Sequence, residues 1–356
     1  MARSMSRVGV YGARIVRYIE FEKIAETVES LCISAGYELP CDVLAALEEA
    51  AQKESNPAAA KILNQLIENA RIAKGERVPL CQDTGLAVVF VQQGAEVSVK
   101  PRVERRAPAG SAPTSGAKSA SPLGDKYLAC SAPASALAET SGFTTGLFDA
   151  INAGVTAGFK KGFLRNSVVT DPLRRNLSDD SQDSKLGIRN SKFLPSTNYT
   201  PAIIHHIIVP GDALKLTVMT KGGGCENKSR FTCLRPTADT DQIIDWIVDV
   251  VRAAGADACP PFVVGVGLGG NFEMSCLLSK MALCRRLDQR NSDKFYAELE
   301  MELLSRINAL GLGPQGLGGD TTALAVLVET APCHIASLPV AVNIECHSHR
   351  HKTAII

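Results

Sequence analysis

The chain has 356 residues, 45% of them hydrophobic and 21% charged, which excludes disorder over most of its length and provides for a sizeable core. Its 38 lysines and arginines nearly balance 37 aspartates and glutamates, so the net charge of +1 does not point to nucleic acid or an anionic membrane. No apolar run reaches the ~20 residues of a membrane span. Eleven cysteines, an odd number, without a secretory signal indicate reduced thiols in a cytoplasmic protein rather than a disulfide scaffold.

Residues 1–19 are predicted to be a basic N-terminal extension, because they carry four arginines and no acidic residue precedes Glu20. An organellar transit peptide has a similar composition and is the alternative. The segment is short and has only two serines, which favours a plain extension.

The first half of the remaining chain is predicted to be helical. Apolar residues recur at helical spacing in three stretches between Glu20 and Ala70, and residues 86–91 (LAVVFV) then indicate a buried strand. In residues 101–142, Ala, Ser, Pro and Gly fill 26 of 42 positions, which predicts a low-complexity insertion without a packed core.

The second half alternates between strand and helix patterns. Residues 202–209 and 214–220, joined by Pro-Gly-Asp, suggest a hairpin. Further helices are expected at 240–254, 272–287 and 293–309, and further strands from 262, at 322–329 and at 340–345. This order predicts an α+β (mixed α/β) fold: a helical N-terminal part followed by mixed sheet and helices, as one domain over residues 20–356 interrupted at 101–142.

Three cysteines stand in polar, turn-rich contexts at predicted element ends, namely Cys81, Cys259 and Cys346. Three thiolates from three loops can bind three irons of a cubane cluster, leaving the fourth iron open as a Lewis acid. On spacing alone, the cluster is one possibility among several: Cys81 could also be a nucleophile, and a lone cysteine is most often a buried thiol. The cysteines on apolar helical faces are interpreted as packing residues: Cys32, Cys276 and Cys284.

Two segments of the chain are rich in glycine, and its last ten residues contain three histidines. Residues 222–224 (GGG) can present backbone N–H groups to a carboxylate or phosphate. Residues 265–270 read GxGxGG rather than GxGxxG, which disfavours a dinucleotide site. The histidines at 347, 349 and 351 are interpreted as a polar chain end.

Five ordered motifs, over about 20–100 and 143–352, resemble the alpha-type half of the iron–sulfur hydro-lyases, the class I fumarate hydratases and L-tartrate dehydratases. They are VPLCQDTG, TKGGGCENKS, ACPPFVVGVGLGG, LGLGPQGLGGDTTA and PCHIASLPVAVNIEC. The resemblance implies that Cys81, Cys259 and Cys346 bind a [4Fe-4S] cluster with one iron that no cysteine ligates. Cys225 stands where these enzymes usually have serine.

The resemblance also implies a substrate site for a small dicarboxylate. Gln82 and Asp83 correspond to a pair that meets the substrate, with Asp83 tied to proton transfer. Arg165 and Gly224 correspond to carboxylate-binding groups, and His334 to a histidine that lies against the substrate.

The activity expected from this resemblance is that of a fumarate hydratase alpha subunit of the tricarboxylic acid cycle type, interconverting fumarate and L-malate. L-tartrate dehydratase is the close alternative, and a non-catalytic iron–sulfur scaffold or sensor is a remote one. Fused relatives continue into a second domain, so we expect a separate beta subunit and a hetero-oligomer, with neither nucleic acid nor membrane as partner.

Overall fold

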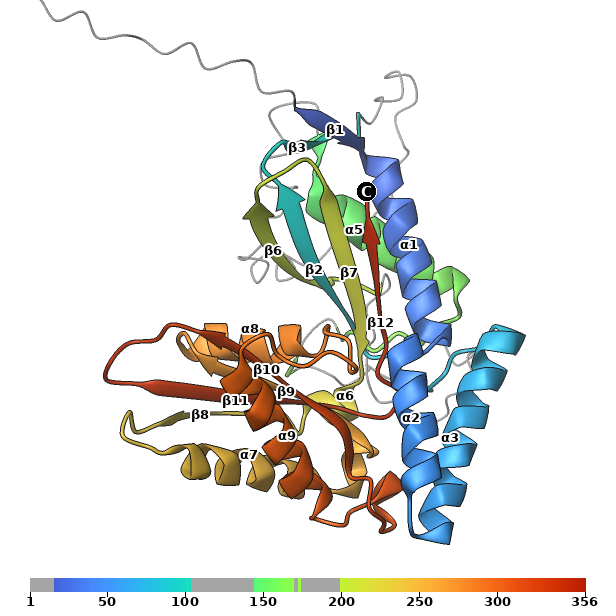
Figure 1. The fold of residues 1–356 in the computed structure, drawn as a ribbon. Coiled ribbons are helices and arrows are strands. Elements are labelled where there is room, and N and C mark those ends of the chain that lie inside the picture. The colour runs from blue at the N-terminus through green and yellow to red at the C-terminus, as the bar shows by residue number, and fades with distance from the viewer. Residues whose placement is uncertain (1–15, 101, 104–143, 170–171, 174–198) are drawn as a thin grey trace, which may run out of the picture.

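The computed structural model describes residues 16–100, 102–103, 144–169, 172–173 and 199–356. They form two sheet-containing lobes that meet at a junction, with helices α2 and α3 beside it (Figure 1). The α+β class is confirmed. The predicted 101–142 insertion lies almost entirely outside the described residues, as do residues 1–15 of the predicted 1–19 extension. The last residues of that extension, from Arg17, belong to a strand that pairs with Val97–Lys100.

The upper lobe is a four-stranded sheet in the order β12–β7–β2–β6. Helices α1 and α5 cover one face, and their apolar residues Ile24, Val28 and Ile151 are buried against it. The elements are α1 (Phe21–Tyr37), β2 (Leu86–Gly94), α5 (Leu147–Lys161), β6 (Ile203–Val209), β7 (Leu214–Lys221) and β12 (His351–Ile355), with the short pairs β1 (Arg17–Glu20) and β3 (Val97–Lys100), and β4 (Arg102–Val103) and β5 (Thr144–Thr145).

The predicted hairpin is wrong, although both of its strands exist. Strands β6 and β7 do not pair with each other, because β2 lies between them, parallel to β6 and antiparallel to β7. The connecting turn passes around the end of β2, where Ala95 N donates to Val209 O (2.8 Å) and Glu96 N to Gly211 O (3.0 Å). The apolar strand β2 is thus an inner strand of the sheet, with a paired strand along each of its two edges.

The lower lobe is a second four-stranded sheet in the order β10–β9–β11–β8. Helix α8 packs on one face, and α7 and α9 pack on the other (Figure 1). The expected helices and strands of this half are confirmed within two residues, except that the helix predicted at 272–287 already ends at Ala282. They are α7 (Thr240–Ala254), β9 (Phe262–Gly269), α8 (Phe272–Ala282), α9 (Lys294–Asn308), β10 (Ala323–Ala331) and β11 (Leu338–Glu345). A short strand, β8 (Arg230–Leu234), is added.

The glycines of the GxGxGG segment serve close packing between helix and sheet. Gly265 and Gly267 lie within β9 under helix α8, where an added Cβ would lie 2.0 Å from Ser279 O and Ser275 O respectively. The helix backbone therefore rests directly on the strand, which only glycine permits. This packing accounts for the pattern without a nucleotide.

The interpretation of residues 347–351 as a polar chain end is wrong. The chain returns from β11 to the upper sheet as β12, and His349, just before it, is fully buried with Nε2 2.7 Å from Leu283 O. Burial lowers the pKa of His349 to about 4 and that of His351 to about 3, so both rings are neutral at pH 7.

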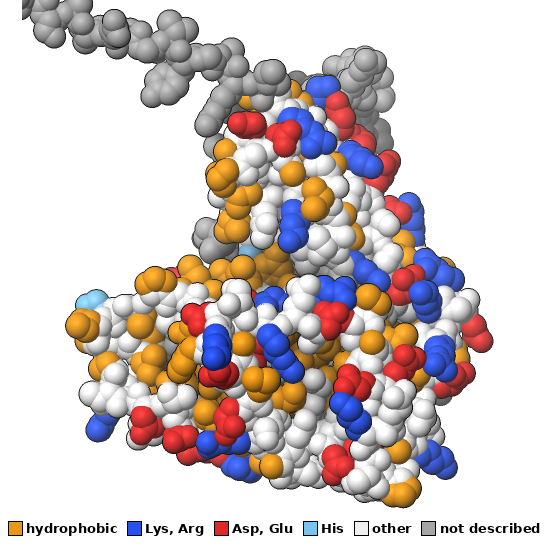
Figure 2. Space-filling model, in the orientation of Figure 1, with side chains coloured by type: hydrophobic (Ala, Val, Ile, Leu, Met, Phe, Trp, Pro, Cys, Tyr) orange, Lys and Arg blue, Asp and Glu red, His pale blue; other side chains and the backbone are white. Residues whose placement is uncertain are grey.

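Residues Phe21–Lys53 are long and apolar enough to cross a membrane by length and composition alone. In the structure they form two helices, α1 and α2 (Cys41–Lys53), separated near Pro40 and followed by α3 (Pro57–Glu76). Their apolar residues Ile24, Val43 and Leu47 are buried in the protein core. On the face in Figure 2, basic and acidic side chains are interspersed.

Replacing Gly267 by Ala should lower the free energy of unfolding by about 3 kcal/mol or more, because the new methyl group collides with the backbone of α8. The matched control is Gly75→Ala in α3, where no atom lies within 4 Å of the added Cβ. That change should stabilise the chain by about 0.5–1 kcal/mol. Urea denaturation measures both; equal stability of the two variants would contradict the packing argument.

Candidate active site

The three predicted cysteine ligands lie at strand ends that face the junction between the lobes. Cys81 comes shortly before β2, Cys259 shortly before β9, and Cys346 directly after β11. These positions are far apart in the sequence, but hydrogen bonds join their loops. His347 N, directly after Cys346, donates to Cys259 O, and Arg350 donates to Asp83 O in the Cys81 loop.

The three thiols interact electrostatically. Burial raises the pKa of Cys259, and the charges of Cys346 and Cys81 raise it further. The pKa of Cys81 is likewise raised by burial and by Cys346, against the opposing effect of Arg350. Cys346 is buried, Cys81 half-buried and Cys259 exposed, so the group runs from the protein interior to the solvent.

Hydrogen bonds hold the Cys259 loop against the Cys346 loop. Cys259 adopts a left-handed conformation (φ 55°) after the 3-10 turn Ala256–Ala258. Its carbonyl oxygen lies 3.4 Å from His347 N and 3.1 Å from His347 Nδ1. Gln315, from the LGLGPQG motif, donates from Nε2 to Pro260 O (3.0 Å) and lies 3.1 Å from His347 Nδ1. This glutamine therefore bridges both cysteine loops.

The Cys81 loop is held against the triple-glycine segment. Gly223 N donates to Asp83 Oδ2 at 2.9 Å, at the start of the one-turn helix α6 (Gly223–Glu226). Gly85 (φ 74°) passes so close to β7 that a Cβ would lie 1.8 Å from Lys221 O. The triple glycine is expected to present N–H groups to a carboxylate or phosphate, and one of these groups, Gly223 N, binds the carboxylate of Asp83.

A fourth thiol, Cys225, lies beside Cys346. The ligand atoms of Cys225, Glu345 and Cys346 all lie within 4.8 Å of one another, and all three residues are buried. The hydrogen bond between the thiols lowers the pKa of Cys346 and raises that of Cys225. Cys225 Sγ also lies 3.5 Å from Ala258 O, to which it donates.

A buried ion pair adjoins these thiols. Lys221 Nζ lies 3.2 Å from Glu345 Oε2, and both side chains are 1% exposed. Burial alone would lower the pKa of Lys221, but Glu345, Cys225 and Glu226 outweigh burial and raise it. The ammonium group also donates to Ile344 O, so its charge is compensated within the protein.

The expected substrate-binding residues are exposed or half-buried. Gln82 is exposed and Asp83 half-buried. Arg165 N donates to Thr84 Oγ1 (3.0 Å), which places this exposed arginine next to the Cys81 loop. Gly224 is exposed in α6, near the Asp257 carbonyl. Within the described residues, no ion pair occupies the Arg165 guanidinium.

His334 is not brought to this group. It lies on the exposed turn between β10 and β11, where Nδ1 accepts from Ala336 N (3.1 Å). Cys346 follows the other end of the eight-residue strand β11, which spans about 25 Å. Within one chain, His334 and Cys346 therefore cannot contact the same small substrate.

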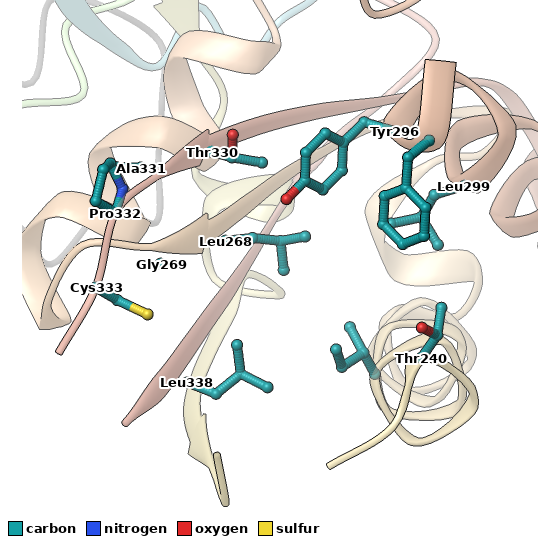
Figure 3. A pocket seen from close by; sticks show the side chains of 12 residues that line it. Thr240, Leu268, Gly269, Tyr296, Leu299, Thr330, Ala331, Pro332, Cys333 and Leu338 are labelled. Carbon is teal, nitrogen blue, oxygen red and sulfur yellow. The ribbon is translucent and has the colours of Figure 1, made fainter. Parts of the chain in front are cut away.

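An apolar cavity of about 420 Å³ lies in the lower lobe, and Cys81, Cys259 and Cys346 do not line it. Figure 3 shows Leu268, Leu338 and Tyr296 around it, at the end of the lower sheet that carries Cys333. None of the expected site residues lines the cavity, so the cavity does not indicate where the active site lies.

Sequence reasoning missed several residues that shape the site. It gave Glu345 and Gln315 no role, and it named Arg350 only as one of several possible second carboxylate clamps. Arg350 stands in the segment interpreted as a polar end, yet it is 2% exposed and donates from Nη2 to Asp83 O at 2.8 Å. Glu345 and Gln315 lie inside motifs of the family, which could have identified them as site residues; Arg350 lies outside these motifs.

Comparison with known proteins agrees with the motifs. Residues 25–113 and 136–355 match the family model described as fumarate hydratase (Fumerase). The chain belongs to this family, a class of iron–sulfur hydro-lyases, which confirms the resemblance.

Individual relatives carry a more specific name. The chain is 33% identical, over 92% of its length and 95% of the relative's, to "Putative L(+)-tartrate dehydratase subunit alpha" of Methanocaldococcus jannaschii. It is 25% identical to L(+)-tartrate dehydratase subunit alpha of Escherichia coli strain K12, over 94% of this chain and 91% of that protein.

The thiol pair predicts a specific disulfide in the iron-free chain. Mild hydrogen peroxide should join Cys225 to Cys346, because their buried sulfur atoms already lie within 4.8 Å; the two thiol hydrogens and the peroxide leave as two waters. Non-reducing peptide mapping by mass spectrometry detects the bond. Cys225→Ser should abolish it and still bind iron, whereas the distant control Cys333→Ser should leave it unchanged. Preferential pairing of Cys81 with Cys259 would contradict the prediction.

Proposed function

We propose that this chain is the alpha-type subunit of an iron–sulfur hydro-lyase that acts on L(+)-tartrate. The observation that carries the proposal is the convergence of Cys81, Cys259 and Cys346 beside Asp83 and the exposed Arg165. Three thiols, an adjacent carboxylate and a guanidinium without an ion-pair partner among the described residues suit a small dicarboxylic acid bound at a metal centre.

The residues present fit an iron–sulfur cluster held by three cysteines. Three thiols from three loops form a soft donor set that is open to solvent on the side of Cys259. The rival donor set of Cys225, Glu345 and Cys346 is less suitable, because Glu345 is already paired with Lys221 at 3.2 Å. A metal cation there would face the lysine ammonium group.

When bound, the cluster would supply a Lewis acid at the iron that lacks a cysteine ligand. The chain's own residues account for the other requirements of dehydration. Arg165 pairs with a substrate carboxylate, and Asp83 accepts the proton from the carbon next to the leaving hydroxyl. The bond from Gly223 N orients Asp83 for that step. Loss of water from tartrate gives an enol that becomes oxaloacetate.

Fumarate hydratase is the second candidate, and it was the one that the motifs favoured. The family model carries that name, whereas the individual relatives above carry the name tartrate dehydratase. Both substrates are dicarboxylates and would use the same clamps; tartrate has one more hydroxyl group than malate. The relatives' names support placing L(+)-tartrate before fumarate.

A beta subunit is the partner that we propose. The relatives are named as alpha subunits, and the cysteine group has an exposed side that a partner can cover. Covering it would exclude water and supply further contacts to the second substrate carboxylate.

Changing any of the three cysteines to serine should remove the cluster, because serine oxygen is a poor ligand for cluster iron. Iron and acid-labile sulfide per chain, and absorbance near 400 nm, should fall below about a tenth of wild type after anaerobic reconstitution. Cys276→Ser, a half-buried thiol on α8, is the matched control and should keep full iron content. Full iron content in Cys81→Ser, Cys259→Ser or Cys346→Ser would refute the ligand assignment.

The reconstituted chain with its beta subunit should dehydrate L(+)-tartrate faster than it hydrates fumarate. Without the partner, we expect a rate lower by about a hundredfold or more, since an unpaired carboxylate in a desolvated site costs several kcal/mol. Coupled detection of oxaloacetate and absorbance of fumarate measure the two activities. Preference for fumarate would reverse the order of the candidates, and full activity of the isolated chain would refute the shared site.

A further inference from the structure

Arg350 is a buried arginine whose hydrogen-bonding groups are mostly unpaired. The residue is 2% exposed, and Nη2 donates to Asp83 O at 2.8 Å. Nε and Nη1 are both buried and have no partner among the residues that the structure describes. A buried cationic donor without an acceptor is costly, so this geometry calls for an anionic group.

The acidic side chains near Arg350 do not fill this role. Within the described part of the chain, no carboxylate lies within 4.0 Å of its guanidinium. The carboxylate of Asp83 accepts from Gly223 N, and Glu345 pairs with Lys221. The hydrogen bond from Nη2 to Asp83 O holds the guanidinium against the Cys81 loop, and Arg350 follows Cys346 by four residues.

The backbone keeps the guanidinium in this place. Arg350 O accepts from Thr220 N (3.2 Å), and the next residue, His351, pairs with Met219 in the ladder between β12 and β7. The arginine is therefore anchored on the upper sheet while its side chain reaches the Cys81 loop.

We infer that Arg350 is a positioning residue that supplies the counter-charge for the iron–sulfur group held by Cys81, Cys259 and Cys346. The inference rests on the proposed function. A [4Fe-4S] core with two positive charges and three thiolates carries one net negative charge, which one guanidinium balances. A substrate clamp is the other role open to an arginine. Arg165 suits that role because it is exposed, whereas the free nitrogens of Arg350 are closed to solvent.

The test compares Arg350→Gln, which removes the charge but keeps an amide donor, with Arg350→Lys, which keeps the charge. Each variant is reconstituted anaerobically, and the rate of iron release to a chelator and the reduction potential of the cluster are measured. Arg350→Gln should release iron at least tenfold faster than wild type. The reduction potential of its cluster should become more negative, because loss of a nearby positive charge disfavours the reduced cluster. A tenfold change in the equilibrium constant for reduction corresponds to about 59 mV for one electron. Arg350→Lys should stay close to wild type in both.

The matched control is Arg285→Gln. Arg285 is partly buried, pairs with Glu300 (2.8 Å) and donates to Val328 O (3.1 Å) in the lower lobe. Its replacement should lower thermal stability without changing iron release. Wild-type release and potential in Arg350→Gln would overturn the inference. If that variant does not fold, rapid iron loss from folded Arg350→Lys would overturn it. A wild-type chain that binds no cluster at all would instead refute the proposed function.

Discussion

The buried ion pair between Lys221 and Glu345 is the interaction on which the site depends. Lys221 ends β7 in the upper sheet and Glu345 ends β11 in the lower sheet, and their charged atoms are 3.2 Å apart. Removing one member of such a pair costs about 3–5 kcal/mol, because the other charge stays buried alone. Cys346 directly follows Glu345, and Cys225 follows Lys221 by one short turn. The pair therefore sets where both thiols lie.

The basic residues of the site differ in whether a carboxylate neutralises them and in whether they are buried. Lys221 is neutralised by Glu345, whereas Arg350 and Arg165 have no carboxylate partner among the described residues. Arg350 is buried and bonded to Asp83 O in the Cys81 loop, whereas Arg165 is exposed. Two negatively charged groups are thus expected, a cofactor on the inner side and a substrate carboxylate on the outer side. Cofactor binding would also contribute to folding, since it relieves a buried unpaired charge.

The sequence predicted those parts that local patterns determine. Amphipathic spacing located the helices α1, α2, α3 and α7, and apolar runs located β2, β9 and β11. Strand pairing was not predictable, because the short turn at 210–213 is compatible with a hairpin as well as with a passage around β2. The end of the chain was misjudged for a related reason. His349 and Arg350 look solvent-exposed by type, and only the return of β12 to the upper sheet buries them.

The cysteine positions illustrate how far such reasoning extends to a site. A polar, turn-rich context separated Cys81, Cys259 and Cys346 from Cys32, which is fully buried in the helical core with its pKa raised to about 12 by burial. Context alone could not show that three loops meet, since that depends on two sheets and a bridging residue, Gln315. Nor could it show that His334 lies at the far end of β11 from Cys346. A motif thus identifies which side chains are suited to the chemistry, whereas the path of the strands decides which of them act together.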